Sequence, residues 1–233
     1  MAIGMRRLLT LGARTDTAEL LDSGRLSRSE VEANLADLAR MNRLPGGTDA
    51  SVRAIEQLIG TGNDVRILDV GTGAGDMPIA FAKRGWNVVA ADANLDVLAV
   101  ADAALARVSG VELVEADALA LPLDDGAVDV AHCSLLIHHL APEAAVMALR
   151  EMRRVARHGV VVNDLRRGLL PLTATWVSVM ALGRSHVTRV DGVISARNSY
   201  TLNELDELFA EAGLTRRWRS PGWLPRVVTA ATA

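Results

Sequence analysis

The sequence of 233 residues has few cysteines and few aromatic residues, and each shortage narrows what the protein can be. Cys133 is its one cysteine, so an intramolecular disulfide framework and a cysteine-rich zinc site are both excluded. Aromatic residues make up only 3% of the chain, so the core must be built from alanine, leucine and valine. Half of the residues are hydrophobic, which is enough for a sizeable core. The cysteine content favours a reducing, cytoplasmic setting.

Strong net charge and long apolar runs are also missing. The formal net charge of −3 argues against a protein that binds nucleic acid or an anionic membrane. An apolar run after Arg7 is too short for a signal peptide and ends at Arg14. The longest uncharged stretch, residues 168–183, falls short of the roughly 20 apolar residues that span a bilayer. We therefore expect no membrane span and interpret this stretch as a buried or pocket-covering helix, with a membrane contact as the alternative.

From residue 65 onward, apolar strands alternate with helical segments. Five strands are expected in the runs VRILDV, WNVVAAD, VELVEAD, VDVAHCS and GVVVND. This alternation indicates a parallel sheet with helices on both faces. Two further strands, LTRRWRS and RVVTAAT, are joined only by PGWLP, which is too short for a crossover helix, so the last strand must be antiparallel. The predicted fold is α/β, a Rossmann-like sheet of seven mostly parallel strands.

Two segments have no place in this sheet. Residues 1–60 contain the helical runs DTAELLD, SRSEVEANLADLARM and VRAIEQLIG, and residues 165–200 interrupt the chain after the fifth strand. We expect an N-terminal helical cap over residues 1–60 and a core over residues 61–233, with the insertion 165–200 closing over the substrate as a lid. Trp176 and Met180 are expected on the inner face of this lid; the alternative is ordinary core packing.

The stretch RILDVGTGAGD, residues 66–76, follows the first expected strand and carries glycines at alternate positions. In open α/β sheets the ligand lies beyond the carboxyl ends of the strands. Gly71 and Gly73 allow the backbone to approach that ligand, and Gly75 allows the next helix to begin close to the strand. The spacing is one residue shorter than the dinucleotide pattern, and Asp69 would repel a pyrophosphate. An NAD-dependent oxidoreductase is therefore the less favoured alternative.

Acidic residues end the first three expected strands. Asp69 suits a cationic ligand, Asp92 can accept hydrogen bonds from both hydroxyls of a ribose, and Asp117, followed by Ala118, can accept one from an adenine amino group. Together these residues describe a pocket for an adenosine that carries a positive charge and no phosphate. S-adenosylmethionine has this chemistry.

The runs LDVGTGAGD, AAD, EADALALPL and VDVAHCSLLIHHL resemble the successive motifs of class I S-adenosylmethionine-dependent methyltransferases. The resemblance implies that Asp69, Gly71 and Gly73 surround the methionine part of the cofactor. It also implies the ribose and adenine positions given above and a backbone contact from Cys133. The further cofactor-binding residues expected are Thr72, Gly75 and Ala93. The runs RRVARHGVVVNDLRRG and LADLARMNRLPGG are similar to a bacterial small-molecule branch that acts on polyketide and phenolic natural products.

The segment after the fourth expected strand narrows the reaction. It lacks the [DN]-P-P-[YF] turn that similar enzymes use to methylate nucleobase or amide nitrogens, and it has Cys133 and Ser134 where metal-assisted catechol-type enzymes place an aspartate. Asn163 and Asp164 alone are a poor Mg²⁺ site, so we expect no metal. His138 and His139 are the candidate general bases for a phenol or enol acceptor; the alternative is a capping or packing role.

The acceptor is expected to be a small, hydrophobic or aromatic molecule that is methylated on oxygen. Methylation on carbon or nitrogen, and a non-catalytic subunit that only binds the cofactor, are the alternatives. The sequence is compatible with a homodimer and predicts no nucleic-acid partner. The charged residues after the fifth strand are either a surface ion-pair group or a binding site for an anionic substrate. The substrate-contacting residues expected are Asp164, Arg166, Trp176, His186 and Arg197.

Overall fold

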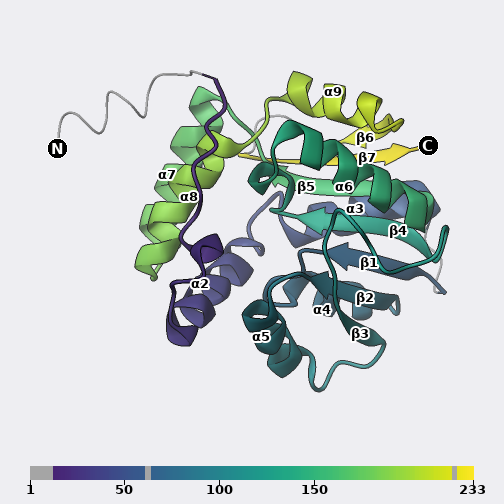
Figure 1. Ribbon diagram of the computed structural model, residues 1–233, viewed down its shortest axis with the longest axis horizontal. Helices are drawn as coiled ribbons and strands as arrows, with labels where there is room; N and C mark the ends of the chain where they lie inside the picture. Colours follow the sequence, from purple (N-terminus) through teal and green to yellow (C-terminus); the bar gives the residue numbers. More distant parts are fainter. Residues whose placement is uncertain (1–12, 61–63, 222–224) are drawn as a thin grey trace.

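A computed structural model of the chain describes residues 13–60, 64–221 and 225–233 (Figure 1). In these residues, seven strands form one sheet in the order β3-β2-β1-β4-β5-β7-β6. All neighbouring pairs from β3 to β5 are parallel, and β7 is antiparallel to both β5 and β6. The predicted sheet with its reversed last strand is confirmed. Its strands are β1 (Arg66–Val70), β2 (Asn87–Asp92), β3 (Val111–Glu115), β4 (Val128–Ser134), β5 (Ala156–Leu165), β6 (Thr215–Arg219) and β7 (Arg226–Thr232).

Helices cover both faces of the sheet, as predicted. Successive strand residues point to opposite faces, so Ile67 packs with α3 and α4, whereas Leu68 packs with α6 and α9. The small cluster around Ala90 adds α5 to the face that carries α3 and α4. Core side chains are mostly valine, leucine and alanine, as the shortage of aromatic residues requires. These helices are α3 (Thr48–Ile59), α4 (Asp76–Ala82), α5 (Leu95–Leu105), α6 (Pro142–Val155) and α9 (Leu202–Glu211).

The N-terminal sixty residues do not form one cap. Helix α3 packs on β5 and β7, and its buried Ile55 belongs to the sheet's own core cluster, so the described part of the cap ends before α3. The run DTAELLD, predicted as a helix, is extended apart from a short 3₁₀ turn at Leu21–Ser23. Its polar side chains bind other segments instead of forming a helix surface, which is why the helical spacing misled the prediction.

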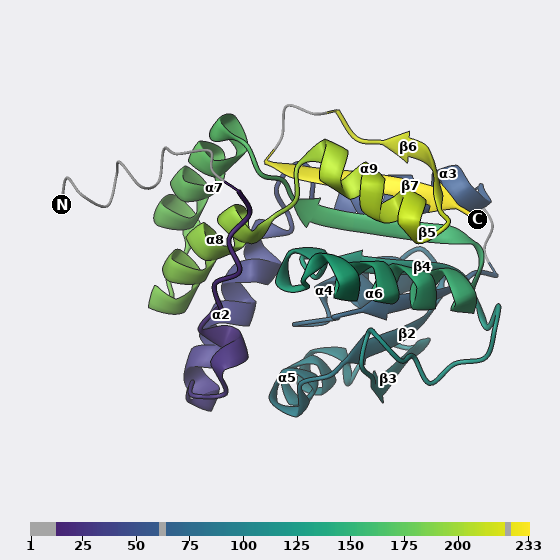
Figure 2. The ribbon, with the colours of Figure 1, turned by 45° about the horizontal axis from the view of Figure 1, so that its top comes forward.

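Three helices form the lid: α2 (Arg28–Met41), α7 (Leu169–Leu182) and α8 (His186–Asn198). Figures 1 and 2 show them grouped at one end of the sheet, where α2 also packs against α5. Ser27 caps the N-terminus of helix α2, and Glu30 completes a capping box with it. Helices α7 and α8 pack against each other, and α2 packs against both. The insertion after β5 thus packs against the described N-terminal segment.

Hydrogen bonds fasten the two parts of the lid together. The buried carboxylate of Asp37 on α2 accepts from the backbone N–H groups of Arg184 at 2.6 Å and Ser185 at 2.8 Å, at the turn between α7 and α8. Asp191 on α8 accepts from the N–H groups of Leu20 at 2.8 Å and Leu21 at 3.1 Å. Buried polar groups that are fully paired in this way fix the relative position of the segments.

The apolar residues of α7 do not all face inward. Val179 is buried, whereas Trp176, Val177 and Met180 are 44%, 51% and 40% exposed. The prediction that Trp176 and Met180 line the inner face of the lid is therefore wrong: these side chains lie on the opposite side of the helix. Among the described residues, no helix combines the length and the apolar character that a membrane span requires.

Candidate active site

A cavity of about 1120 Å³ opens where β1, β2, β4 and β5 end, underneath the lid. Single-ligand pockets usually enclose about 300–1,000 Å³, so this cavity has room for two ligands side by side. The strand ends contribute one part of its wall, including Val70, Asp92 and Ser134. The lid contributes the other part, including Leu35 and Leu38 of α2 and Val179 of α7. The cavity thus lies beyond the carboxyl ends of the strands, where the ligand was predicted to bind.

The glycine loop after β1 forms the floor of this cavity. Gly71 and Gly73 both line it, and both have the left-handed backbone that glycine tolerates, with φ of 70° and 56°. The N–H groups of Gly71 and Thr72 donate to the carbonyl oxygen of Ala91 at 2.8 and 3.0 Å, which ties the loop to the end of β2. Thr72 also lines the cavity, and its contact with the cofactor stays a prediction.

The acidic residues that end β2 and follow β3 also line the cavity, with Ala93 and Ala118 beside them. Asp92 accepts from the N–H of Gly73 at 3.2 Å and from that of Asn94 at 3.0 Å, so its carboxylate is held at the cavity edge. Burial raises the pKa of Asp92, and the hydrogen bonds from Asn94 and Gly73 only partly oppose this effect. Asp117 accepts from the N–H of Leu119 at 2.9 Å.

Asp69 contacts other side chains of the protein and does not face the ligand cavity, contrary to the prediction. It is buried, and it does not line the cavity among the described residues. Its carboxylate accepts from the Thr72 hydroxyl at 2.8 Å and lies 2.7 Å from Nδ1 of His132, whose Nε2 lies 2.9 Å from the hydroxyl of Ser51 on α3. Asp69 therefore supports the glycine loop from behind, and the carboxylate that reaches the cavity near this loop is Asp76, at the start of α4.

Two further cofactor predictions fall on residues that the described structure places behind the wall. Cys133 is completely buried in the core, and the chain reaches the cavity only from Ser134 onward. Leu135 has φ of 56°, an unusual value for a residue with a side chain, and turns the chain toward the cavity. A Cβ on Gly75 would meet Leu105 at 3.1 Å, so Gly75 serves the close packing of α4 and α5.

Arg226, at the start of β7, is a site residue that sequence reasoning missed. It is buried at the cavity wall, and burial lowers its pKa to about 10. Its guanidinium donates to Asn163 Oδ1 at 3.0 Å, to Ser134 Oγ at 2.8 Å and to Asn42 Oδ1. Within the described residues these partners are neutral oxygens. A lone arginine in the otherwise apolar strand run RVVTAAT was the available signal, because a buried arginine is rare without a partner.

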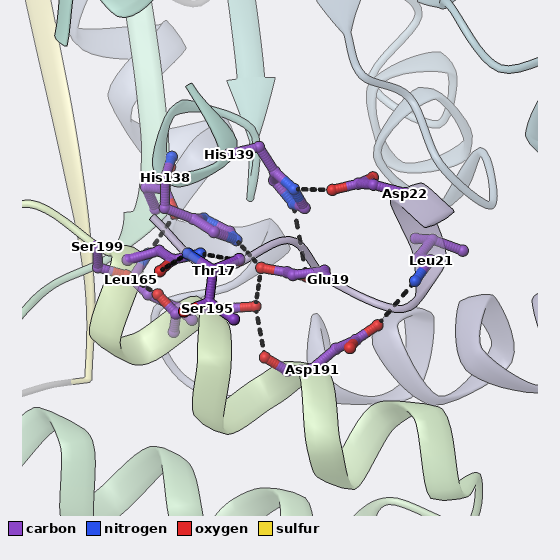
Figure 3. A network of polar contacts seen from close by, with 12 residues as sticks. Thr17, Glu19, Leu21, Asp22, His138, His139, Leu165, Asp191, Ser195 and Ser199 are labelled. Atoms are coloured by element: carbon purple, nitrogen blue, oxygen red, sulfur yellow. Dashed lines mark hydrogen bonds and ion pairs between the residues drawn. The ribbon is translucent and has the colours of Figure 1, made fainter. Parts of the chain in front are cut away.

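His138 and His139 line the cavity together with Glu19, which the sequence did not single out. Both histidines lie in a short 3₁₀ turn after β4, at Ile137–His139, and Glu19 lies in the segment that precedes α2. His138 Nε2 lies 3.5 Å from one Glu19 oxygen, and His139 Nε2 lies 3.8 Å from the other. Figure 3 shows both rings turned toward this carboxylate. Both predicted catalytic histidines thus face the same carboxylate, that of Glu19.

His138 is held between two carboxylates. Its Nδ1 lies 2.5 Å from Asp164 Oδ1, and its backbone N–H donates to the other oxygen of Asp164 at 3.1 Å. Burial alone would lower the pKa of His138, but the charge of Asp164 and the hydrogen bonds to Asp164 and Glu19 outweigh burial and raise it to about 10. These contacts favour the imidazolium form, which has no lone pair for a proton, so His138 must first lose this proton to act as the predicted general base.

The predicted substrate residues are mostly placed elsewhere. Asp164 acts through His138 and does not itself line the cavity in the described structure. Trp176 and His186 are exposed, and neither they nor Arg166 and Arg197 belong to the described wall. The polar residues that α8 presents to the cavity are Thr188, Asp191 and Ser195. Helical periodicity indicates that a helix has an apolar face, but it does not show which way that face points. The prediction therefore placed the substrate-contacting residues on the wrong side of the helices of the insertion.

Comparison with known proteins relates part of this chain to a protein family. Residues 67–159 match the family described as "Methyltransferase domain". This match covers less than half of the chain. The fold is similar to that of solved S-adenosylmethionine-dependent methyltransferases. The enzyme class and its cofactor stay predictions, which the family match supports.

Two curated proteins and one solved structure illustrate what this chain is similar to. Demethylmenaquinone methyltransferase of Clavibacter sepedonicus is 34% identical over 125 residues, which are 53% of this chain and 49% of that protein. The enzyme of the same name from Thermus thermophilus is 41% identical over 97 residues, 40% of this chain and 43% of that protein. This chain thus spans about half the length of these curated relatives. A SAM-dependent methyltransferase from Aquifex aeolicus has a similar fold, with a TM-score of 0.64 at 18% identity over 89% of this chain and 98% of that chain.

Proposed function

We propose that this protein transfers the methyl group of S-adenosylmethionine to an oxygen of a small, aromatic acceptor. The observation that carries the proposal is that one cavity has two chemically different ends. The glycine loop, Asp92 and Asp117 line one end, and Glu19, His138 and His139 line the other, under the lid. A donor with an adenosine group suits the first end, and an acceptor with a hydroxyl group suits the second.

At the donor end, the residues match the parts of the cofactor in order. Gly71 and Gly73 take the methionine part, Asp92 accepts from the ribose hydroxyls, and Asp117 with Ala118 meets the adenine. We assign Arg226 to the methionine carboxylate. Its described hydrogen-bond partners are neutral, and a buried guanidinium favours an anion. Asp76, whose oxygen accepts from Asn42 at 2.8 Å, suits the ammonium group of the same methionine.

At the acceptor end, the lid supplies an apolar wall. Leu35, Leu38 and Met41 of α2 and Val179 of α7 line it, and they suit the faces of an aromatic ring. Methyl transfer from a sulfonium is an in-line displacement, so the protein must orient the acceptor and promote loss of its proton. A cover that excludes water also strengthens the electrostatic interactions in the site. We assign His138 and His139 to the neighbourhood of the reacting oxygen.

Methylation of a ring carbon is the second candidate. It is favoured by the two demethylmenaquinone methyltransferases among the relatives, whose names point to a quinone-type acceptor. The same apolar cavity would hold such a ring, and the hydroxyl next to the reacting carbon would face the same histidines.

The test is methyl transfer from isotopically labelled S-adenosylmethionine to a panel of phenols, naphthols and quinols, with the product identified by mass spectrometry and NMR. Label on oxygen supports the first candidate, and label on a ring carbon supports the second. A protein that binds S-adenosylhomocysteine tightly but labels none of these acceptors would contradict the proposal and favour a non-catalytic subunit.

A further inference from the structure

The cluster of Glu19, His138 and His139 has a geometry that the proposed methyl transfer does not by itself explain. One ring nitrogen of each histidine and one carboxylate oxygen of Glu19 lie within 4.8 Å of one another, and Nε2 is the nitrogen of each ring that faces Glu19. Each of these atoms carries a lone pair when the histidines are neutral. Lone pairs that converge in this way repel one another unless a positive charge lies between them. That charge is either a proton on an imidazole or a bound cation.

The outer atoms of the two rings leave both Nε2 atoms available to a cation, which would take the place of the proton that His138 otherwise carries. Nδ1 of His138 faces Asp164 at 2.5 Å, and Nδ1 of His139 faces Asp22 at 2.8 Å. An ionised carboxylate only accepts hydrogen bonds, so each Nδ1 carries the proton and each Nε2 is directed at Glu19. This arrangement of carboxylate, histidine and open Nε2 is the one that orients imidazole ligands in metal sites, and here it occurs twice.

Glu19 is supported in the same way. Its Oε1 accepts from the hydroxyl of Ser195 at 2.6 Å, and the next two residues, Leu20 and Leu21, are held by Asp191 (Figure 3). The turn that carries the histidines is also clamped, because Arg14 donates to the carbonyl oxygens of His138 at 2.9 Å and Leu140 at 2.7 Å. All three side chains are therefore held in place from behind.

We propose that Glu19, His138 and His139 bind one divalent transition-metal cation, of the kind represented by Zn²⁺ or Co²⁺, at the acceptor end of the cavity. Two imidazoles and a carboxylate suit such cations better than they suit Mg²⁺. Ligands at about 2.1 Å in a tetrahedral site lie about 3.4 Å apart. Nε2 of His138 lies 3.5 Å from one Glu19 oxygen, and Nε2 of His139 lies 3.8 Å from the other oxygen, close to this spacing. The prediction of no metal considered only the ends of the fourth and fifth strands, and Glu19 comes from outside the sheet.

Three protein ligands that line a cavity leave a coordination position for a substrate. The role of this position rests on the proposed function. A hydroxyl of the acceptor that binds the cation loses its proton to water, since a divalent cation lowers the pKa of a bound O–H group. The resulting oxyanion attacks the methyl carbon of S-adenosylmethionine. The C–O bond forms, the C–S bond breaks, and its electron pair stays on sulfur, which leaves neutral S-adenosylhomocysteine.

The experiment is a titration of the chelator-treated, tag-free full chain with Co²⁺, followed by its visible d–d absorption, without cofactor or acceptor. We expect one equivalent to bind and competition by Zn²⁺. Glu19→Gln and His139→Ala should each weaken binding at least tenfold, and Asp22→Asn should weaken it about 10- to 100-fold by freeing the His139 ring. His158→Ala is the matched control, because this exposed histidine lies near Asp129, at 3.8 Å, at the start of β5.

Calorimetric binding of S-adenosylhomocysteine by each variant shows that its fold is intact and separates the two proposals. Wild-type protein that binds S-adenosylhomocysteine but no Co²⁺ would overturn the metal site and leave methyl transfer standing. Co²⁺ binding without S-adenosylhomocysteine binding would overturn the proposed function instead. Co²⁺ that binds the Glu19→Gln and His139→Ala variants as tightly as wild type would also overturn the metal site, since the ion would then lie elsewhere.

Discussion

Replacing Asp92 with alanine should separate cofactor binding from stability of the fold. In the proposed complex, the carboxylate accepts hydrogen bonds from the ribose hydroxyls and already accepts from the N–H groups of Gly73 and Asn94. A hydrogen bond to a charged group contributes about 1.5–3 kcal/mol. Since 1.4 kcal/mol is about a factor of ten, the Kd for S-adenosylhomocysteine should rise roughly 10- to 150-fold, as measured by isothermal titration calorimetry.

The fold itself should tolerate this change. Burial raises the pKa of Asp92 above its ordinary value of 3.8, so the folded chain holds this proton more tightly than the unfolded chain does. As the pH rises from 3.8 through the raised pKa, the ionised group therefore lowers the free energy of unfolding. Removing this group should therefore change the free energy of unfolding at pH 7, measured by denaturant titration, by no more than about 1 kcal/mol. Asp102→Ala, an exposed carboxylate on α5, is the control. Unchanged affinity in a folded Asp92→Ala variant would refute the ribose assignment.

Three further changes test other parts of the site. Arg226→Lys should weaken S-adenosylhomocysteine at least tenfold but leave adenosine, which lacks the carboxylate, unaffected in the same calorimetric assay; equal losses for both ligands would contradict a carboxylate contact. Ser178→Trp, at the cavity wall, should raise the KM for the acceptor about tenfold or more, whereas Val177→Trp on the exposed side of α7 should not; identical kinetics would place the acceptor elsewhere. Asp37→Ala should speed hydrogen exchange at residues 184–185 by an amount equivalent to about 2 kcal/mol, and unaltered exchange would show that this contact does not hold the lid.

The sheet could be predicted because its signals are local. Buried strand runs, a glycine loop and helices of ordinary length follow one another from residue 65, and the short connection before the last strand leaves only an antiparallel pairing. The loop residues and the acids that end the strands were also predictable, because strand ends of a parallel sheet meet at one edge. Gly71, Gly73, Asp92 and Asp117 accordingly line the cavity.

The part of the cavity under the lid could be predicted only for His138 and His139, because the rest of it is assembled from distant segments. Glu19 reaches the histidines only because Asp191, more than 170 positions further along the chain, binds the backbone next to it. The apolar residues of α7 indicated a helix with a buried side but gave no sign of which side, and Trp176 lies on the exposed one. Asp69 was assigned to the ligand because it ends the first strand beside the glycine loop, and its contact with His132 on the neighbouring strand arises only when the sheet forms.

A crystal structure of the protein with bound S-adenosylhomocysteine tests the central claim most directly. We predict adenine beside Asp117 and Ala118, ribose hydroxyls on Asp92, the methionine carboxylate on Arg226, and the sulfur facing the open part of the cavity that Glu19, His138 and His139 line. A ligand bound outside this cavity, or one whose sulfur faces away from these three side chains, would contradict the account.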